Sequence, residues 1–290
     1  MNLKELGRTG VKVPAVGMGT WGIGGHLTAD TAHDDEAIRA LRRGIELGMY
    51  LIDTAEMYGA GHAEEVVAEA IKPFSREEVF IVSKVLPENL HYADVIKAAQ
   101  ESLRRLQTDW IDLYLIHFPN PRIPLRETIE AMGKLAEQNL VRFIGVSNFD
   151  VSQIEEARSY LSKNDIVANQ VEYSLLERSV ERDVLPYCAR QRITVMAYTP
   201  LGLGRLARSG FLREIGKRYE KTAAQVALNW LIAKENVIAI PKAVNIDHLE
   251  ENAGAMGWTL SGDDAERISS WFVQSQVSSE PTQTNNQPTC

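Results

Sequence analysis

Four titratable side chains stand where three short apolar runs of the sequence end. Asp53 and Tyr58 follow the first run, Lys84 closes the second and His117 closes the third. Short apolar runs that stop abruptly at polar or glycine residues are typical of buried parallel strands leading into a loop. If these strands are neighbours, their carboxyl ends share one edge. An acid, a phenol, an amine and an imidazole, all groups that exchange protons, would then meet in one pocket.

Each of the four residues alone also has an ordinary structural explanation. Asp53 could cap a turn and Tyr58 could pack in a loop. Lys84 could be solvated, and His117 could be a core histidine bonded to the backbone. Their joint placement at the ends of consecutive strands favours a functional pocket, because α/β sheets hold their ligands at that edge.

The rest of the chain alternates strand-like with helix-like segments. Strand-like runs begin near Val16, Met49, Val79, Ile111, Val141, Ile166, Thr194 and Val237. Amphipathic stretches cover residues 34–47, 63–71, 92–106, 125–138, 151–161, 180–190, 223–233 and 247–255. Eight strands alternating with eight helices predict an α/β fold of the closed (β/α)8, or TIM-barrel, type.

Both ends of the chain depart from this repeat. Residues 3–6 and 11–13 flank a Gly-Arg-Thr-Gly turn and predict an N-terminal β-hairpin. Residues 262–272 predict an extra C-terminal helix, so that residues 1–272 form a single barrel domain. Residues 273–290 are rich in Ser, Gln, Asn, Thr and Pro, which predicts a flexible polar tail, with a flap over the pocket as the alternative.

Composition excludes several classes of partner. The net charge of −8 argues against a nucleic-acid binder, which needs a basic face. The two cysteines, Cys188 and Cys290, are too few for a disulfide framework and lack metal-ligand spacing, so we expect a reducing compartment. The first residues lack a signal-peptide core, and no apolar run is long enough to cross a bilayer. We therefore expect a cytoplasmic protein without a membrane partner, as a monomer or weak homo-oligomer.

Residues 17–22 read Gly-Met-Gly-Thr-Trp-Gly and match the dinucleotide fingerprint G-x-G-x-x-G. That fingerprint requires a helix opening directly on the glycines and an acidic residue about 20 positions later. Here the next helix signal waits until Asp34, and Arg42 and Arg43 occupy the distal positions. We interpret the match as chance in a glycine-rich loop, which disfavours a Rossmann domain.

A series of ordered motifs over about residues 3–272 resembles the aldo-keto reductase family. The motifs are D-T-A-E-M-Y-G from Asp53, the lysine ending the third strand, L-Y-L-I-H from Leu113, G-V-S-N-F from Gly145, N-Q-V-E-Y from Asn169, A-Y-T-P-L-G from Ala197, and I-P-K with a later E-N pair at Glu251. The resemblance, to a prokaryotic-type member with short loops, implies a barrel that binds NADP(H) across its carboxyl-terminal rim. It implies an oxidoreductase that reduces aldehydes or ketones, or runs the reverse reaction, without a metal.

The resemblance also assigns roles to the four residues. Hydride arriving at a carbonyl carbon leaves negative charge on the oxygen, so a proton donor must stand beside it. Tyr58 is expected to be that donor and Lys84 the cation that stabilises its phenolate. Asp53 would hold Lys84 in place, and His117, neutral, would orient the carbonyl.

Further residues are expected to contact the cofactor or the substrate. By the same resemblance Ser147, Asn148 and Gln170 hold the nicotinamide carboxamide, and Tyr198 stacks on the ring. A Ser-Asn pair could instead only cap the following helix. The other expected cofactor contacts are Thr20, Trp21, Asp53, Thr199, Leu201, Gly202, Lys242, His248, Glu251 and Asn252. The expected walls of the substrate pocket are Trp21, Met57, Phe118 and Trp271.

The chain departs from the family pattern at the expected site of the cofactor 2′-phosphate. Relatives with strong NADP(H) preference have a lysine, a hydroxyl residue and an arginine, whereas this chain has Lys242, Ala243 and His248. An imidazole lacks the two-pronged grip of a guanidinium. Asn245 is predicted to cap the helix that follows, whose N–H groups would face the phosphate. We expect NADPH to be preferred by a reduced margin, with some tolerance of NAD(H), and the margin to grow as pH falls from about 8 to 6.

Two other functional classes compete with this interpretation. A non-catalytic NADP(H)-binding sensor or partner subunit, like the β subunits of potassium channels that resemble this family, is compatible with an intact set of four residues. A metal-dependent hydrolase is disfavoured, because the six histidines show no ligand spacing. The loop of residues 118–124 is short and holds three prolines, which predicts an open pocket that accepts several small carbonyl compounds.

Overall fold

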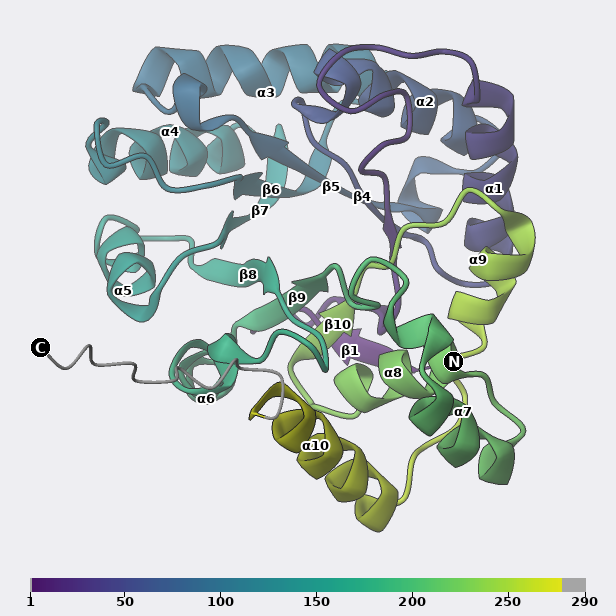
Figure 1. Cartoon of the computed structure of the whole chain (residues 1–290). Helices are drawn as coiled ribbons and strands as arrows, with labels where there is room; N and C mark the ends of the chain where they lie inside the picture. The colour runs from purple at the N-terminus through teal and green to yellow at the C-terminus, as the bar shows by residue number, and fades with distance from the viewer. Residues whose placement is uncertain (1, 278–290) are drawn as a thin grey trace, which may run out of the picture.

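The computed structural model describes residues 2–277 of the chain. At its centre eight parallel strands form one sheet in the order β10-β9-β8-β7-β6-β5-β4-β3 (Figure 1). The strands are β3 (Met18–Gly19), β4 (Leu51–Asp53), β5 (Phe80–Val85), β6 (Ile111–Ile116), β7 (Val141–Ser147), β8 (Ile166–Glu172), β9 (Thr194–Tyr198) and β10 (Val237–Ala239). Each strand therefore pairs with the next one along the chain.

Backbone contacts join the two edges of the sheet. Val16 forms a parallel bridge with Ala239, and Gly17 N donates to Ala239 O at 2.8 Å. Gly19 N donates to Pro241 O at 3.0 Å. The residues before and within β3 thus meet β10, which confirms the predicted (β/α)8 fold.

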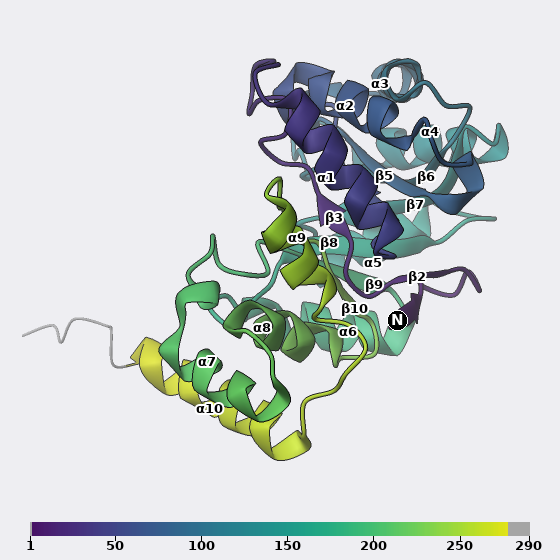
Figure 2. The same cartoon turned by 90° about the vertical axis from the view of Figure 1, so that its right-hand side faces the viewer.

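Helices cover the outside of the sheet in all directions (Figures 1 and 2). The eight that follow the strands are α1 (Asp34–Glu46), α2 (His62–Ile71), α3 (Tyr92–Leu106), α4 (Leu125–Glu137), α5 (Val151–Ser159), α6 (Val184–Gln191), α8 (Ala223–Ile232) and α9 (Ile246–Ala253). Most of their bounds agree with the predicted stretches within a few residues. One helix, α7 (Gly210–Gly216), was not predicted.

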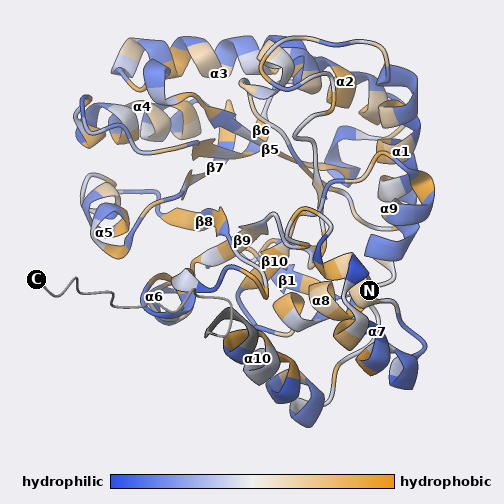
Figure 3. Ribbon diagram, viewed as in Figure 1, coloured by the Kyte–Doolittle hydropathy of each residue, from blue (hydrophilic) through white to orange (hydrophobic). Residues whose placement is uncertain are grey.

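Apolar burial on both faces of the strands explains why they read as unbroken apolar runs. Every residue of β5 and β6 is buried, and one apolar cluster fills the barrel interior with residues such as Leu51, Val82 and Leu113. A larger cluster joins the outer faces of the strands to the helices. In Figure 3 the central strands are largely orange, whereas the helices around them mix blue and orange. Each fully buried aliphatic side chain stabilises the fold by about 1.5–3 kcal/mol.

The predicted N-terminal hairpin packs under the barrel. Strands β1 (Leu3–Glu5) and β2 (Lys12–Pro14) pair antiparallel. Next to them Leu6 joins the interior apolar cluster, and Gly7 N donates to Thr194 Oγ1 at 2.8 Å, at the first residue of β9. The hairpin therefore covers the amino-terminal ends of the strands and leaves their carboxyl ends for the site.

The last helix, α10 (Gly262–Val277), lies beside α7 (Figure 2). It continues to Val277, so the predicted boundary between helix and tail at residue 272 was wrong. The remainder of the predicted tail, residues 278–290, lies outside the described residues. Across residues 2–277, no helix is both long and apolar enough to cross a membrane.

Candidate active site

A buried lysine connects the first three predicted site residues. Lys84, near the end of β5, donates from Nζ to Asp53 Oδ2 at 2.9 Å and to Thr54 O at 2.9 Å. The same Nζ lies 3.1 Å from Tyr58 Oη. Lys84 is 0% exposed, and Asp53 ends the neighbouring strand β4. The pairing of β4 with β5 brings these groups together at the carboxyl edge of the sheet.

Burial and charge act on this group in opposite directions. Burial lowers the pKa of Lys84, but the Asp53 carboxylate and Tyr58 outweigh that effect and the pKa is raised. Burial raises the pKa of the Tyr58 phenol, and the Lys84 ammonium opposes that rise without cancelling it. The group therefore holds a charged amine against a protonated phenol at neutral pH.

His117 follows β6 and faces the same edge. Its ring centroid lies 5.7 Å from that of Tyr58, in an edge-to-face arrangement. Burial, together with the nearby Lys84 ammonium, lowers the pKa of His117 to about 3. The imidazole is therefore neutral at physiological pH, and the structure brings all four predicted residues together.

Aromatic rings extend from this group toward the solvent. The Trp21 ring lies 5.0 Å from Tyr58, and Phe118 stacks on His117 at 5.0 Å. Trp21 and Phe118 are 42% and 41% exposed, so both reach the surface. His26 lies 5.3 Å from Trp21 and was missed, because a single histidine in a glycine-rich loop carries no spacing signal.

The other two expected pocket residues behave differently. Met57 packs against the small cluster of Ala55, Tyr58 and Ala63, beside the buried lysine. Trp271 belongs to α10, where its ring stacks on Phe211 of α7 at 4.6 Å. Trp271 therefore packs on α7, and its place in the wall of the pocket stays a prediction.

A chain of hydrogen bonds links the expected carboxamide-binding residues to the acid of the site. Gln170 Nε2 donates to Asp53 Oδ1 at 2.7 Å, and Ser147 Oγ donates to Gln170 O at 2.9 Å. Asn148 Nδ2 donates to Ser147 Oγ at 3.0 Å, and Tyr198 Oη donates to Asn148 Oδ1 at 3.0 Å. The link between Gln170 and Asp53 was not predicted.

The alternative explanation of Ser147 and Asn148 as helix caps does not hold. Asp150 is the N-cap of α5, and its side chain accepts from Gln153 N at 2.8 Å. Asn148 instead adopts a left-handed backbone with φ of 61° at the end of β7. Neither side chain therefore caps α5.

The remaining expected cofactor contacts lie along the rim of the barrel. Thr20 is fully buried and donates from Oγ1 to Asp53 O at 3.0 Å. Thr199 and Gly202 have left-handed backbones, with φ of 51° and 55°. Leu201, between them, is half-buried. Thr199, Leu201 and Gly202 lie in the loop after β9, next to Tyr198.

The segment after β10 carries the expected phosphate-binding residues. Lys242 and His248 are exposed on either side of the start of α9. Asn245 caps that helix, with Oδ1 accepting from His248 N at 3.1 Å, as predicted. In α9, Glu251 is half-buried and Asn252 is buried. Helix α9 packs beside α1 (Figures 1 and 2).

A hollow of about 600 Å³ lies at the other end of the strands. Its lining includes Tyr50, Phe80 and Trp110, which precede or begin β4, β5 and β6. It contains none of the predicted site residues. Within residues 2–277 the structure also has no group of three His, Cys, Asp or Glu side chains placed to hold a metal ion.

The model of the Aldo/keto reductase family matches residues 15–271. Methylglyoxal reductase YeaE of Escherichia coli is 44% identical over 256 residues, which span 87% of this chain and 88% of that protein. The crystal structure of the thermostable aldo-keto reductase Tm1743 has a TM-score of 0.89 at 48% identity, covering 93% of this chain and 99% of that one. An aldo-keto reductase from Klebsiella pneumoniae in complex with NADP and acetate has a TM-score of 0.85 at 37% identity, covering 100% of both chains.

Proposed function

This chain belongs to the aldo-keto reductase family, and we propose that it reduces small aldehydes and dicarbonyl compounds, with Tyr58 delivering the proton. NADPH-dependent carbonyl reduction is the activity supported by the family match, by the methylglyoxal reductase relative and by the NADP-bound neighbour. The same site can run in reverse on an alcohol, because each step is reversible.

One observation carries the assignment of roles. Tyr58 Oη lies 3.1 Å from a fully buried ammonium, Lys84 Nζ, which Asp53 holds at 2.9 Å. When bound, NADPH supplies the hydride. Tyr58 gives its proton to the carbonyl oxygen, and Lys84 stabilises the phenolate that remains. Neutral His117 donates a hydrogen bond that orients the same oxygen.

The residues along the rim suit the chemical groups of the cofactor. The side chains of Ser147, Asn148 and Gln170 offer the hydroxyl and amide groups that a carboxamide pairs with. The loop after β9 contains Gly202 and Gly204, which allow close approach of backbone to a diphosphate. Further along the rim, the cation of Lys242 and the N-terminus of α9 suit the 2′-phosphate.

The proposed substrate class rests on the shape of the pocket mouth. The half-exposed rings of Trp21 and Phe118 flank Tyr58 and His117 without a long loop over them. The loop from Phe118 to Pro124 holds three prolines and is too short for a lid. An open aromatic mouth fits small aldehydes and dicarbonyls, the class that includes the substrate named for the Escherichia coli relative.

The test is a steady-state assay of the pure protein with NADPH, following cofactor absorbance. Methylglyoxal, glyoxal, a small aldehyde and a bulky aromatic aldehyde form the panel. We expect turnover of all the small compounds, with high KM for most. Cofactor binding without any turnover would favour the sensor alternative, and a preference for one substrate by several orders of magnitude would contradict the open pocket.

We also propose a cytoplasmic location and a monomer or weak homo-oligomer. The location is supported by the low cysteine content and by the buried, free thiol of Cys188, which fit a reducing compartment. Sedimentation velocity at several protein concentrations tests the oligomeric state.

A further inference from the structure

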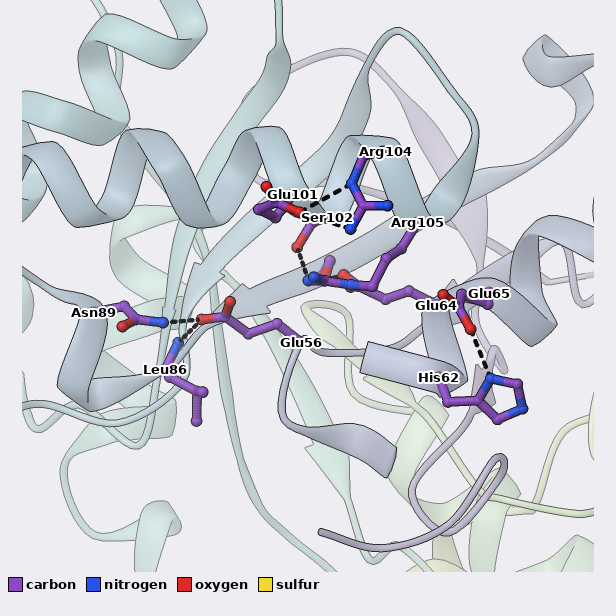
Figure 4. A network of polar contacts seen from close by, with 11 residues as sticks. Glu56, His62, Glu64, Glu65, Leu86, Asn89, Glu101, Ser102, Arg104 and Arg105 are labelled. Atoms are coloured by element: carbon purple, nitrogen blue, oxygen red, sulfur yellow. Dashed lines mark hydrogen bonds and ion pairs between the residues drawn. The ribbon is translucent and has the colours of Figure 1, made fainter. Parts of the chain in front are cut away.

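A buried ion pair between Glu64 and Arg105 lies on the outer face of the sheet (Figure 4). Glu64, in the first turn of α2, is 0% exposed. Its Oε2 accepts from Arg105 Nε at 2.6 Å, and its Oε1 accepts from Ser83 Oγ at 2.5 Å. The pair therefore joins three elements, namely α2, α3 and β5.

Stability alone gives no reason for burying this pair. Removing two charges from water costs about as much as their attraction returns, and apolar residues of similar size often do equally well. Buried ion pairs can instead select one geometry among several.

The hydrogen bond from Ser83 connects this pair to Lys84. Ser83 and Lys84 are consecutive residues of β5, so their side chains point to opposite faces of the sheet. Lys84 contacts Tyr58 on the inner side, and Ser83 contacts Glu64 on the outer side. The segment from Tyr58 to Glu64 is thus attached to one short piece of β5 at both ends.

The turn between these two attachments needs external support. Gly59, Ala60 and Gly61 all have left-handed backbones, with φ of 58°, 53° and 95°. Consecutive left-handed residues are disfavoured, particularly for alanine. Arg105 lies over the turn, because a Cβ added to Gly61 would be 2.7 Å from Arg105 Cδ. Arg105 therefore packs on the turn in addition to pairing with Glu64.

A second carboxylate braces the chain on the other side of Tyr58 (Figure 4). Glu56 Oε1 accepts from Leu86 N at 2.6 Å and from Asn89 Nδ2 at 3.1 Å. Leu86 lies two residues after Lys84. The segments before and after Tyr58 are consequently both tied to the strand that carries Lys84.

We propose that Glu64, through Ser83 and Arg105, is a positioning residue that fixes the contact between Tyr58 Oη and Lys84 Nζ during proton transfer. This inference rests on the proposed role of Tyr58 as the proton donor. Glu64 and Arg105 would then contribute to the reaction without touching the substrate or the cofactor.

Weakening the contacts among Ser83, Glu64 and Arg105 should change both kcat and its dependence on pH. A misplacement of about 1 Å can reduce turnover by roughly 100-fold, so we expect kcat to fall about 10-fold or more. In alcohol oxidation Tyr58 must first lose its proton, so the rate rises with pH. A weaker contact with the Lys84 ammonium moves the midpoint of that rise to higher pH. The other titratable groups around Tyr58 are Asp53, His117 and Tyr198, and the variants below leave all three unchanged.

The experiment compares two variants that each neutralise a buried carboxylate without changing its shape. Glu64→Gln removes the charge behind the site. Asp112→Asn is the matched control, because Asp112 is 3% exposed, pairs with Arg76 at 2.7 Å and accepts from Ile81 N of β5 at 3.0 Å. It holds the same strand at its opposite end.

For each variant we would measure kcat, the dissociation constant of NADPH, the pH profile of alcohol oxidation and the unfolding midpoint. Glu64→Gln should lower kcat and move the pH midpoint upward, with NADPH affinity unchanged. Asp112→Asn should lower only the unfolding midpoint. Unchanged kcat and pH midpoint in Glu64→Gln, or the same changes in Asp112→Asn, would overturn the proposal.

A third variant covers the case in which Glu64→Gln does not fold. Ser83→Ala keeps the ion pair and removes only its link to β5, and it should move kcat and the pH midpoint in the same directions by a smaller factor. If neither kcat nor the pH midpoint changes in Ser83→Ala, the proposal is overturned as well. Tyr58→Phe separates the two inferences, because normal turnover in that variant refutes the proton-donor role itself, whatever Glu64→Gln does.

Discussion

Replacing Lys84 by methionine tests the electrostatic part of the proposed mechanism. The variant keeps an unbranched apolar stem and removes the charge that lies 3.1 Å from Tyr58 Oη. At an effective dielectric constant of about 20, two unit charges at that distance attract by about 5 kcal/mol. If half of the phenolate charge has developed in the transition state, the loss is about 2.5 kcal/mol, which corresponds to a fall in kcat of roughly 70-fold.

The same change also affects stability, and this effect must be separated from the loss of catalysis. Without Lys84, the Asp53 carboxylate is buried with no cation, which destabilises a protein by about 3–5 kcal/mol. The double variant Asp53→Asn/Lys84→Met removes both charges, and the new amide can still accept from Gln170 Nε2. We expect the double variant to recover most of the free energy of unfolding and none of the turnover.

The assay combines urea unfolding with NADPH consumption for the wild type, Lys84→Met and the double variant. Recovery of turnover together with stability in the double variant would refute the reasoning. It would mean that Lys84→Met is inactive because the unpaired Asp53 disturbs the site, and not because Tyr58 lacks a neighbouring cation.

Three further predictions concern pH, the cofactor and the backbone. Burial lowers the pKa of folded His117 to about 3, below that of an unfolded histidine near 6.5. As pH falls from about 6 to 4, the unfolded chain binds a proton at His117 that the folded chain does not bind. The free energy of unfolding of the wild type, measured in urea, should therefore fall by about 1.4 kcal/mol per pH unit relative to that of His117→Asn. A difference between the two proteins that stays constant with pH would contradict this. His248→Arg should raise the ratio of NADH to NADPH dissociation constants, because a guanidinium can grip the 2′-phosphate with two hydrogen bonds, whereas an unchanged ratio would exclude contact of His248 with the phosphate. In Gly59→Ala the new Cβ would lie 2.2 Å from Gly24 O, so we expect kcat to fall about 10-fold or more. Gly210→Ala is the control, because a Cβ at that position meets nothing within 4 Å. Equal kcat values in the two variants would show that the left-handed turn after Tyr58 is not needed.

The sequence was sufficient to predict the fold because its signals are local and repeated. Unbroken apolar runs identify strands that are buried on both faces, and the helical stretch of residues 92–106 coincides with α3. Helix α7 was missed because seven residues bounded by glycines carry too short a pattern, although Ser209 caps it. The end of α10 was placed too early because its last turns are polar.

The strand ends also made the central group predictable, since Asp53, Lys84 and His117 each close an apolar run and parallel strands end together. The ion pair behind them was not predictable. Glu64 and Glu65 look alike in the sequence, as two acids in the first turn of a helix, yet one is fully buried and the other exposed. Arg105, its partner, lies on another helix, and neither periodicity nor spacing connects the two.

Single-turnover reduction of methylglyoxal in Tyr58→Phe tests whether Tyr58 donates the proton in carbonyl reduction. The matched control is Tyr114→Phe, since Tyr114 is a fully buried tyrosine that packs between the barrel and the helices. Fluorescence titration gives the NADPH dissociation constant of each. We expect both variants to bind NADPH like the wild type, Tyr114→Phe to reduce methylglyoxal at the wild-type rate, and Tyr58→Phe to be slower by at least about 100-fold. A near-wild-type rate in Tyr58→Phe would contradict this expectation.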